Sequence, residues 1–303
     1  NITYTEGVKL GVGERSFLMP LKINKTDTSG MGAAVKNARN AELVVMVLGE
    51  DAFQSGEGRS QANIGLAGLQ MELLKAVHKV NKNIVLVLIN GRPLELSWSA
   101  KNIPAIVEAW QLGSESGNAI ADVLLGKYNP SGKLPVSFPR AVGQEPLYYN
   151  HKNTGRPSSA EHVTYAHYTD IENGPLYPFG FGLSYTNFDY AMPELSVETI
   201  KAGENASLSV AVTNSGDRKG KEVVQLYLRD LVATTARPVK ELKAFKMIEL
   251  EPGETKIVEF NINEEMLKFY NASEKWEAEN GEFELMVGGN SEDVQSVKFN
   301  FSN

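Results

Sequence analysis

Residues 69–91, LQMELLKAVHKVNKNIVLVLING, contain a helical pattern followed directly by a strand pattern. The run at 84–89 is apolar throughout, as expected of a strand that is buried on both faces. The first half has apolar side chains three or four residues apart, at Leu69, Leu73, Leu74, Val77 and Val80. That spacing places them on one face of an amphipathic helix, so the stretch predicts one helix–strand repeat of an α/β fold.

Similar patterns lie on both sides of this stretch. Residues 31–41, MGAAVKNARNA, have helical apolar spacing and run into the apolar stretch ELVVMVLGE at 42–50. A third strand pattern, AIVEAW at 105–110, precedes a helical pattern, ESGNAIADVLLG, at 115–126. That helix is expected to end at Gly126 and to bury one face, formed by Ile120, Val123 and Leu124. Apolar strands separated by helices predict a mostly parallel sheet with helices on both faces.

The second half of the chain has the period of strands. Four segments alternate apolar and polar residues between turn clusters: ASLSVAVTNSGD, KEVVQLYLRD, KIVEFNI and GEFELMVGG. This pattern predicts an antiparallel β-sandwich of about immunoglobulin size. We therefore predict an α/β domain over residues 1–150, a connecting segment over 151–190 and an all-β domain over 191–303. The irregular chain around the connecting segment is long enough that we expect it to pack on a neighbour or to serve a site.

Composition excludes several classes of protein. The 303 residues carry a formal charge of −7, which disfavours a nucleic-acid partner because phosphate recognition needs clustered Lys and Arg. No apolar stretch is long enough to cross a bilayer, so no membrane partner is expected. The absence of cysteine rules out disulfides and thiolate chemistry. A neutral or polyol substrate fits this composition better than a nucleic acid does.

An acidic loop follows the first strand pattern. Residues 49–61, GEDAFQSGEGRSQ, lie where ligands bind in open α/β sheets, beyond the carboxyl ends of the strands. Glu57 stands between two glycines, and partial burial would let such a carboxyl act as a general acid. The other interpretation is a solvated turn, and the pattern alone leaves both open. Glu50 and Asp51 are more typical of a helix cap or a strand end.

Other chemistries find little support in the sequence. There is no phosphate-binding Gly-rich motif with the required context, and the four histidines lack metal-ligand spacing. The segment GSESG places Glu115 where a serine nucleophile elbow needs serine. We therefore expect no metal and no organic cofactor.

Longer blocks of the sequence resemble a known family. The segments INGRPLEL, AWQLGSESGNAIADVLLGKYNPSGKLPVSFPR and LYPFGFGLSYTNF are similar to the C-terminal part of family 3 glycoside hydrolases, the β-glucosidase group. The resemblance extends from about Ala33 to the end of the chain. It implies an α/β sandwich domain, whose first strand and helix would precede Asn1, followed by a fibronectin-III-like domain. It also implies an N-terminal barrel that carries an aspartate nucleophile and that this chain does not contain.

The resemblance places the family's acid/base glutamate on Glu57, with Glu50 or Asp51 as the fallback. Many relatives have arginine where this sequence has Gln61, so the local ion pairs are expected to differ. The implied activity is that of an exo-acting, retaining β-glucosidase acting on oligosaccharides or β-glucosides, without a cofactor. The alternatives are a parent β-xylosidase or N-acetylglucosaminidase, or a non-catalytic carbohydrate-binding or scaffold module. The resemblance also implies a periplasmic or secreted enzyme and leaves a homodimer open.

Overall fold

The computed structural model describes every residue except residue 157, and it divides into two compact units. Residues 1–121 and 138–145 form the first unit, and residues 122–137 and 146–303 form the second. Each unit consists of residues that pack mainly against one another. The three-part domain division expected from the sequence stays a prediction.

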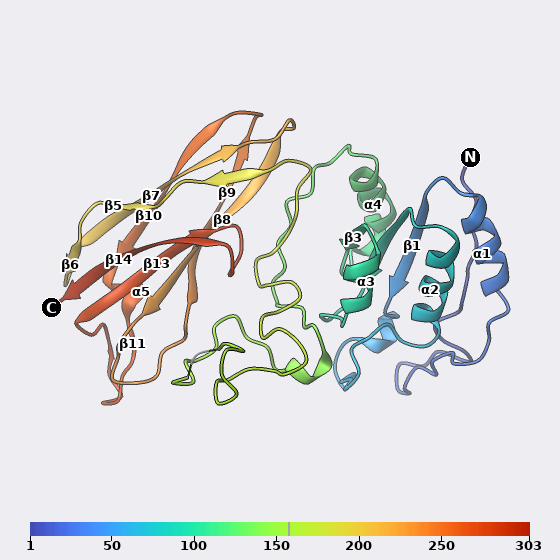
Figure 1. The fold of residues 1–303 in the computed structure, drawn as a ribbon, viewed down its shortest axis with the longest axis horizontal. Helices are drawn as coiled ribbons and strands as arrows, with labels where there is room; N and C mark the ends of the chain where they lie inside the picture. Colours follow the sequence, from blue (N-terminus) through green and yellow to red (C-terminus); the bar gives the residue numbers. More distant parts are fainter. Residues whose placement is uncertain (157) are drawn as a thin grey trace. The chain divides into compact units, whose positions relative to one another are not determined.

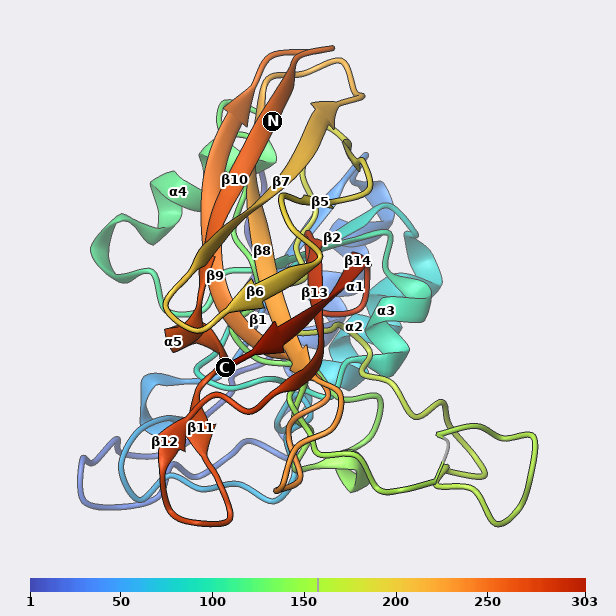
Figure 2. The same ribbon diagram turned by 90° about the vertical axis from the view of Figure 1, so that its left-hand side faces the viewer.

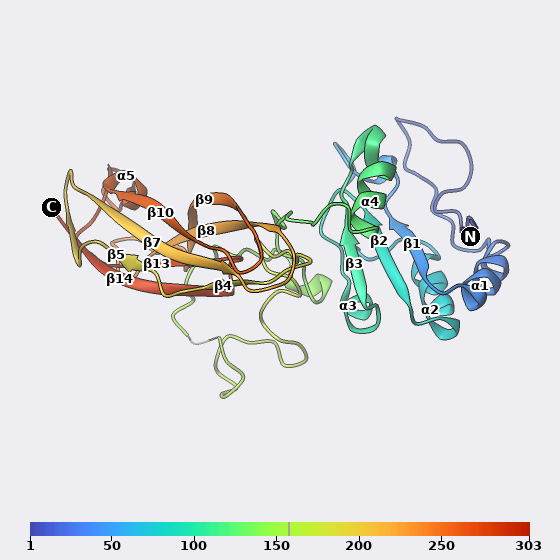
Figure 3. The same cartoon turned by 90° about the horizontal axis from the view of Figure 1, so that it is seen from above.

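The first unit is built on a parallel sheet with strand order β1-β2-β3. In register, Val44 lies opposite Ile84, and Val85 lies opposite Ala105. Its strands are β1 Val44–Gly49, β2 Ile84–Ile89 and β3 Ala105–Glu108. Its helices are α1 Met31–Asn40, α2 Gln70–Val80, α3 Ser97–Asn102 and α4 Ser116–Leu124, with 3-10 turns at Ala52–Gln54, Gly113–Glu115 and Val142–Gln144. Figure 3 shows α2 and α3 on one side of this sheet and α4 on the other.

The amphipathic face of α2 explains the packing of the first unit. Leu73, Leu74 and Val77 are buried, as the apolar spacing predicts, on a helix that packs against β1 and α1. On β1 the outward side chains are not covered, since Val45 and Val47 are 44% and 56% exposed. The predicted parallel sheet with helices on both faces is confirmed.

Two helices of the first unit differ in detail from the expectation. The predicted buried side of α4 is only half-buried, because none of its residues is fully enclosed. The short helix α3 was not predicted, because six residues are too few to show a helical period. Trp98 of α3 packs edge-on against His78 of α2, with the ring centroids 5.3 Å apart.

The second unit is a β-sandwich of two main sheets (Figure 1). One sheet has the order β10-β7-β4, with β5 also paired to β7, and the other has the order β6-β14-β13-β8-β9. The strands are β4 Phe188–Tyr190, β5 Glu194–Leu195, β6 Thr199–Lys201, β7 Asn205–Asn214, β8 Gly220–Asp230, β9 Glu241–Leu250, β10 Thr255–Asn263, β13 Gly281–Gly288 and β14 Val294–Ser302. The short helix α5 Glu264–Leu267 precedes a hairpin of β11 Phe269–Tyr270 and β12 Trp276–Glu277, which projects from one end of the sandwich (Figure 2).

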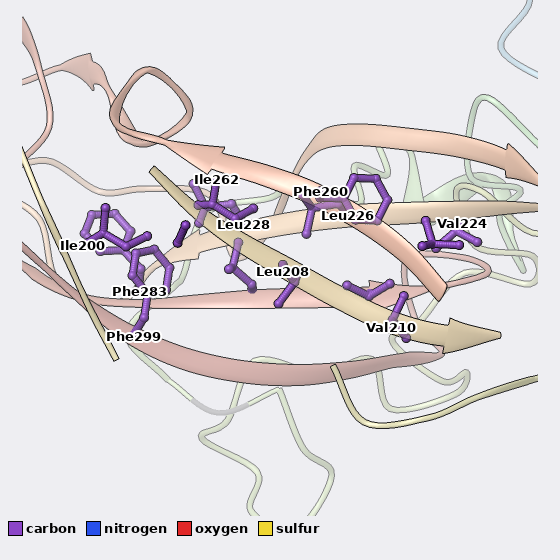
Figure 4. Packing of buried hydrophobic residues seen from close by; sticks show 14 of the residues in the cluster. Ile200, Leu208, Val210, Val224, Leu226, Leu228, Phe260, Ile262, Phe283 and Phe299 are labelled. Atoms are coloured by element: carbon purple, nitrogen blue, oxygen red, sulfur yellow. The ribbon is translucent and has the colours of Figure 1, made fainter. Parts of the chain in front are cut away.

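Alternate residues of the long strands fill the space between the two sheets. Figure 4 shows Leu208 and Val210 of β7 facing Leu226 and Leu228 of β8, with Phe283 of β13 beside them. Each is at most 3% exposed. Burial of a side chain of this size contributes about 1.5–3 kcal/mol, so this layer holds the sandwich together.

The irregular segment before the sandwich packs on the outer face of β8. Tyr149 stacks on Phe179 with ring centroids 4.2 Å apart and lies edge-on to the buried Tyr227. The side chain of Gln225 donates a hydrogen bond to the carbonyl oxygen of Gly180 at 3.1 Å. The expectation that this long segment packs on a neighbour is therefore confirmed.

A buried ion pair fixes residues 122–137 to the sandwich within the second unit. The Lys133 ammonium lies 3.1 Å from both carboxylate oxygens of Glu222, whose side chain is 5% exposed. The Tyr190 hydroxyl donates to the same carboxylate at 2.9 Å. Burial raises the pKa of Glu222 and the positive charge of Lys133 partly offsets this rise. Burial, together with the negative charge of Glu222, raises the pKa of Tyr190.

Candidate active site

The acidic loop, residues 50–61, begins at the carboxyl end of β1, where its first residues are fixed by hydrogen bonds. The Glu50 amide donates to the carbonyl oxygen of Ile89 at 2.7 Å, which extends the pairing of β1 with β2. The buried side chain of Gln70, at the start of α2, accepts from the Gly49 amide and donates to the Gly49 carbonyl, both at 2.8 Å. These bonds set the direction in which the loop leaves the sheet.

Glu57 lies at the tip of this loop, and its side chain is exposed. Its neighbours Gly56 and Gly58 have φ angles of 115° and 68°, which side chains disfavour. Nothing lies within 4 Å of where a Cβ would stand at either glycine, so it is the backbone conformation that favours glycine there. Among the described residues, none forms a hydrogen bond or ion pair with the Glu57 carboxylate. The loop therefore presents a carboxyl group that is free to meet a ligand.

Glu50 is held differently from Glu57. Its carboxylate lies 2.8 Å from the Nε atom of Arg92 and also accepts from the Gly91 amide at 3.0 Å. The two side chains are 5% and 18% exposed. Both oxygens of Glu50 are engaged, so this group is built into the base of the loop and is not free to shuttle protons.

Asp51 caps the 3-10 turn that follows it. Its carboxylate accepts from the Phe53 amide at 3.0 Å, and the Gln54 side chain accepts from the Asp51 amide at 2.9 Å. It also forms an ion pair with Arg15 at 2.8 Å. The cap expected from the sequence is present, and it gives this carboxylate a local structural role.

Gln61 and Arg59 make different contacts on the far side of the loop. The side chain of Gln61 donates a long hydrogen bond of 3.5 Å to the carbonyl of Gln54. The guanidinium of Arg59 donates to the carbonyl of Phe17 at 2.7 Å. Neither residue forms an ion pair with the loop carboxylates in the part of the chain that is described.

Glu108, at the end of β3, is a half-buried carboxyl group that the sequence pattern did not single out. Burial raises its pKa to about 7, although the Trp110 amide at 3.0 Å and the Asn90 side-chain amide at 3.3 Å favour the ionised form. Asn90 is fully buried, and no described residue bonds to its Oδ1 atom. Beside this cluster a hollow of about 300 Å³ is lined by Glu50, Ile89 and Trp110, with Glu57 outside it.

The raised pKa of Glu108 predicts a pH-dependent stability. The folded chain holds this proton up to about pH 7, whereas the unfolded chain releases it near 4.5, so the free energy of unfolding falls as the pH rises between these values. Glu108→Gln should remove a fall of about 2–3 kcal/mol between about pH 5 and about pH 8, since one unit of pKa corresponds to about 1.4 kcal/mol. Urea unfolding at about pH 5 and about pH 8 measures this difference. If the variant and the parent lose the same stability over this range, the assignment to Glu108 is wrong.

Residues 1–156 and 158–303 contain neither a group of acidic and histidine side chains able to hold a metal ion nor a helix with the length and apolarity of a membrane span. The residues that sequence reasoning missed are Arg92, Gln70 and Glu108. Arg92 lies in the loop after the buried strand β2 and Glu108 ends the apolar strand β3, and these places at the carboxyl edge of the sheet are the signal that could have drawn attention to them.

Comparison with known families decides what this arrangement belongs to. Residues 2–185 match the model of the "Glycosyl hydrolase family 3 C-terminal domain". The chain belongs to glycosyl hydrolase family 3. Residues 222–291 match the model of a fibronectin type III-like domain. The α/β architecture followed by a fibronectin-III-like sandwich is thus that of the C-terminal part of this family.

Named relatives in family 3 include several glycosidases. The chain is 48% identical over 268 residues to a periplasmic beta-glucosidase of Salmonella typhimurium, covering 88% of the chain and 35% of the relative. It is 40% identical over 301 residues to a beta-xylosidase of Formosa agariphila, covering 98% of the chain and 41% of the relative. A crystal structure of a beta-glucosidase from Listeria innocua in complex with glucose matches with a TM-score of 0.88 and 40% identity. That match covers 93% of this chain and 39% of the other, so the chain spans about two-fifths of the proteins it matches.

Proposed function

We propose that the chain is the C-terminal part of a retaining, exo-acting β-glucosidase and that Glu57 is its general acid/base. The observation that carries the proposal is the exposed, unbonded carboxylate of Glu57 at the sheet edge of a family 3 chain. Glu50 and Asp51 are less suited to the role, because their carboxylates are engaged by Arg92 and by the 3-10 turn.

In this proposal the nucleophile is an aspartate of a barrel domain outside the chain. The aspartate attacks the anomeric carbon while Glu57 transfers its proton to the departing glycosidic oxygen, which leaves a glycosyl–enzyme ester and a Glu57 carboxylate. That carboxylate then takes a proton from water, whose oxygen displaces the aspartate from the anomeric carbon. Two displacements give net retention of configuration and need no cofactor.

A second candidate is a β-xylosidase, which the Formosa agariphila relative supports. Both candidates use the same acid/base chemistry and differ in the sugar that the enzyme accepts. The sugar-binding residues would come mainly from the barrel domain, which lies outside this chain.

The two candidates can be separated by assaying the full-length enzyme on nitrophenyl β-D-glucoside and nitrophenyl β-D-xyloside. We expect kcat/KM to be about tenfold or more higher for the glucoside, a size typical of discrimination by a binding pocket. The first sugar released, followed by proton NMR, should be the β-anomer. Release of the α-anomer first would contradict a retaining mechanism. A kcat/KM that is higher for the xyloside by the same factor would favour the β-xylosidase.

We also propose a periplasmic or secreted location, because the Salmonella typhimurium relative is named as periplasmic. Fractionation of the source cells tests it, and recovery of the enzyme in the cytosolic fraction would contradict it. A homodimer is the oligomeric state to test, by light scattering of the full-length enzyme.

A further inference from the structure

One guanidinium group joins both ends of the turn that carries Glu57. Arg92 stands in the loop after β2 and contacts the acidic loop. Its Nη2 atom donates to the carbonyl oxygen of Gln54 and, at 3.1 Å, to the carbonyl oxygen of Arg59. These two carbonyls bracket the four residues 55–58, which include Glu57. Arg92 therefore closes the base of the turn.

The tip of the turn has little of its own to hold it. Gly56 and Gly58 have open space around their backbones, and the Arg59 amide donates to the Gly56 carbonyl at 3.1 Å. The base, in contrast, is tightly packed, since a Cβ at Gly91 would lie 2.0 Å from the Ser55 Oγ atom. The position of the Glu57 carboxyl group is thus set mainly by how the base is held.

Glu50 completes the arrangement by fixing Arg92. Its Oε1 atom lies 2.8 Å from the Arg92 Nε atom, and its Oε2 atom accepts from the Gly91 amide in the same loop. The guanidinium donates from one nitrogen, Nη2, to the two carbonyls, while its positive charge pairs with the Glu50 carboxylate beside Nε. The ion pair is mostly removed from water, which strengthens it and makes the loss of either partner costly.

We propose that Arg92 is a positioning residue for the acid/base group and that Glu50 acts by orienting Arg92. The inference rests on the proposed role of Glu57 and names the residues that position its carboxyl group. A displacement of about 1 Å at a catalytic group costs up to about 100-fold in rate. Loss of Arg92 should therefore weaken proton transfer while the nucleophilic attack continues.

The test compares substrates whose leaving groups differ in their need for a proton. In the full-length enzyme, Arg92→Met and Arg92→Lys should lower kcat/KM, which reports only formation of the glycosyl–enzyme, by about 10- to 100-fold on phenyl β-glucoside. On 2,4-dinitrophenyl β-glucoside, which needs little protonation, the loss of kcat/KM should be about threefold or less. Lysine keeps the charge, but its single nitrogen cannot contact both carbonyls and the Glu50 carboxylate at once, so we expect it to behave like methionine. Glu50→Gln should show the same leaving-group dependence with a smaller loss.

Arg39→Met is the matched control, because Arg39 is an exposed arginine on α1 and should leave both rates unchanged. A purely structural role of Arg92 would lower both rates equally through loss of folded enzyme. Equal losses, or an Arg92→Lys variant with parental rates, would overturn the inference.

Glu57→Ala is measured in the same series. If Glu57→Ala shows the leaving-group dependence and the Arg92 variants do not, only the positioning inference is wrong. If Glu57→Ala also lacks the leaving-group dependence, the proposed function itself is contradicted.

Hydrogen exchange gives a second measurement that does not depend on activity. In this chain, Arg92→Met should speed the exchange of the Gln54 and Arg59 amides, which donate to the carbonyls of Asp51 and Gly56, while exchange in α2 and in the β-sandwich stays as in the parent. Unchanged exchange in the turn would also overturn the inference.

Discussion

Replacing Glu57 with alanine in the full-length enzyme is expected to lower kcat/KM on phenyl β-glucoside by about 10²- to 10⁴-fold. This is the range that a general acid contributes when the leaving oxygen needs a proton. On 2,4-dinitrophenyl β-glucoside the first step needs no acid, so formation of the glycosyl–enzyme should slow far less. The ratio of the two losses in kcat/KM, which reports formation of the glycosyl–enzyme and not its hydrolysis, identifies the role.

Glu72→Ala is the control for this substitution, since Glu72 is an exposed carboxylate on the first turn of α2. It should leave both rates within about twofold of the parent, because surface substitutions of this kind have small effects. Equal losses on the two substrates in Glu57→Ala would show that Glu57 acts in binding or folding and that the acid/base group lies elsewhere.

The second large effect is expected at the buried ion pair of the β-sandwich unit. Lys133→Met leaves the Glu222 carboxylate buried without its cation, and loss of one partner of such a pair costs about 3–5 kcal/mol of unfolding free energy. Urea unfolding of the chain, followed by hydrogen exchange in β8 and β13, assigns the loss to the sandwich. Adding Glu222→Gln to Lys133→Met should restore part of the stability, because the unpaired charge is then removed.

Lys219→Met provides the comparison for an exposed pair. Lys219 lies 3.0 Å from Glu249 and 2.8 Å from Glu251, with half of its side chain in water. Its loss should cost little unfolding free energy, because water screens an exposed pair. If Lys133→Met costs no more than Lys219→Met, the buried pair does not hold residues 122–137 to the sandwich.

Much of the fold could be predicted because its elements have a clear apolar period. The face of α2 with Leu73, Leu74 and Val77, and the apolar run of β2, each follow directly from sequence spacing. Strand β9 could not be predicted from alternation alone. Its outward residues Phe245 and Met247 are apolar and 65% and 60% exposed, so the polar half of the pattern is absent.

The position of the candidate site in the fold could be predicted from the sequence, but the contacts that hold its side chains could not. The acidic loop follows a buried strand, and ligands bind at that edge of a parallel sheet, which is enough to point to Glu57. The link from Arg92 to both ends of the turn depends on how closely two separate loops approach. The sequence also does not distinguish the engaged carboxylates of Glu50 and Asp51 from the free carboxylate of Glu57.

The most direct test of Glu57 as the acid/base group is to add azide to Glu57→Ala and identify the product. With the carboxylate gone, azide has room to attack the glycosyl–enzyme without needing a base. We predict that azide raises turnover of 2,4-dinitrophenyl β-glucoside and that the product is β-glucosyl azide, as seen by NMR. Turnover that is unchanged by azide, or an azide product of α configuration, would contradict the assignment.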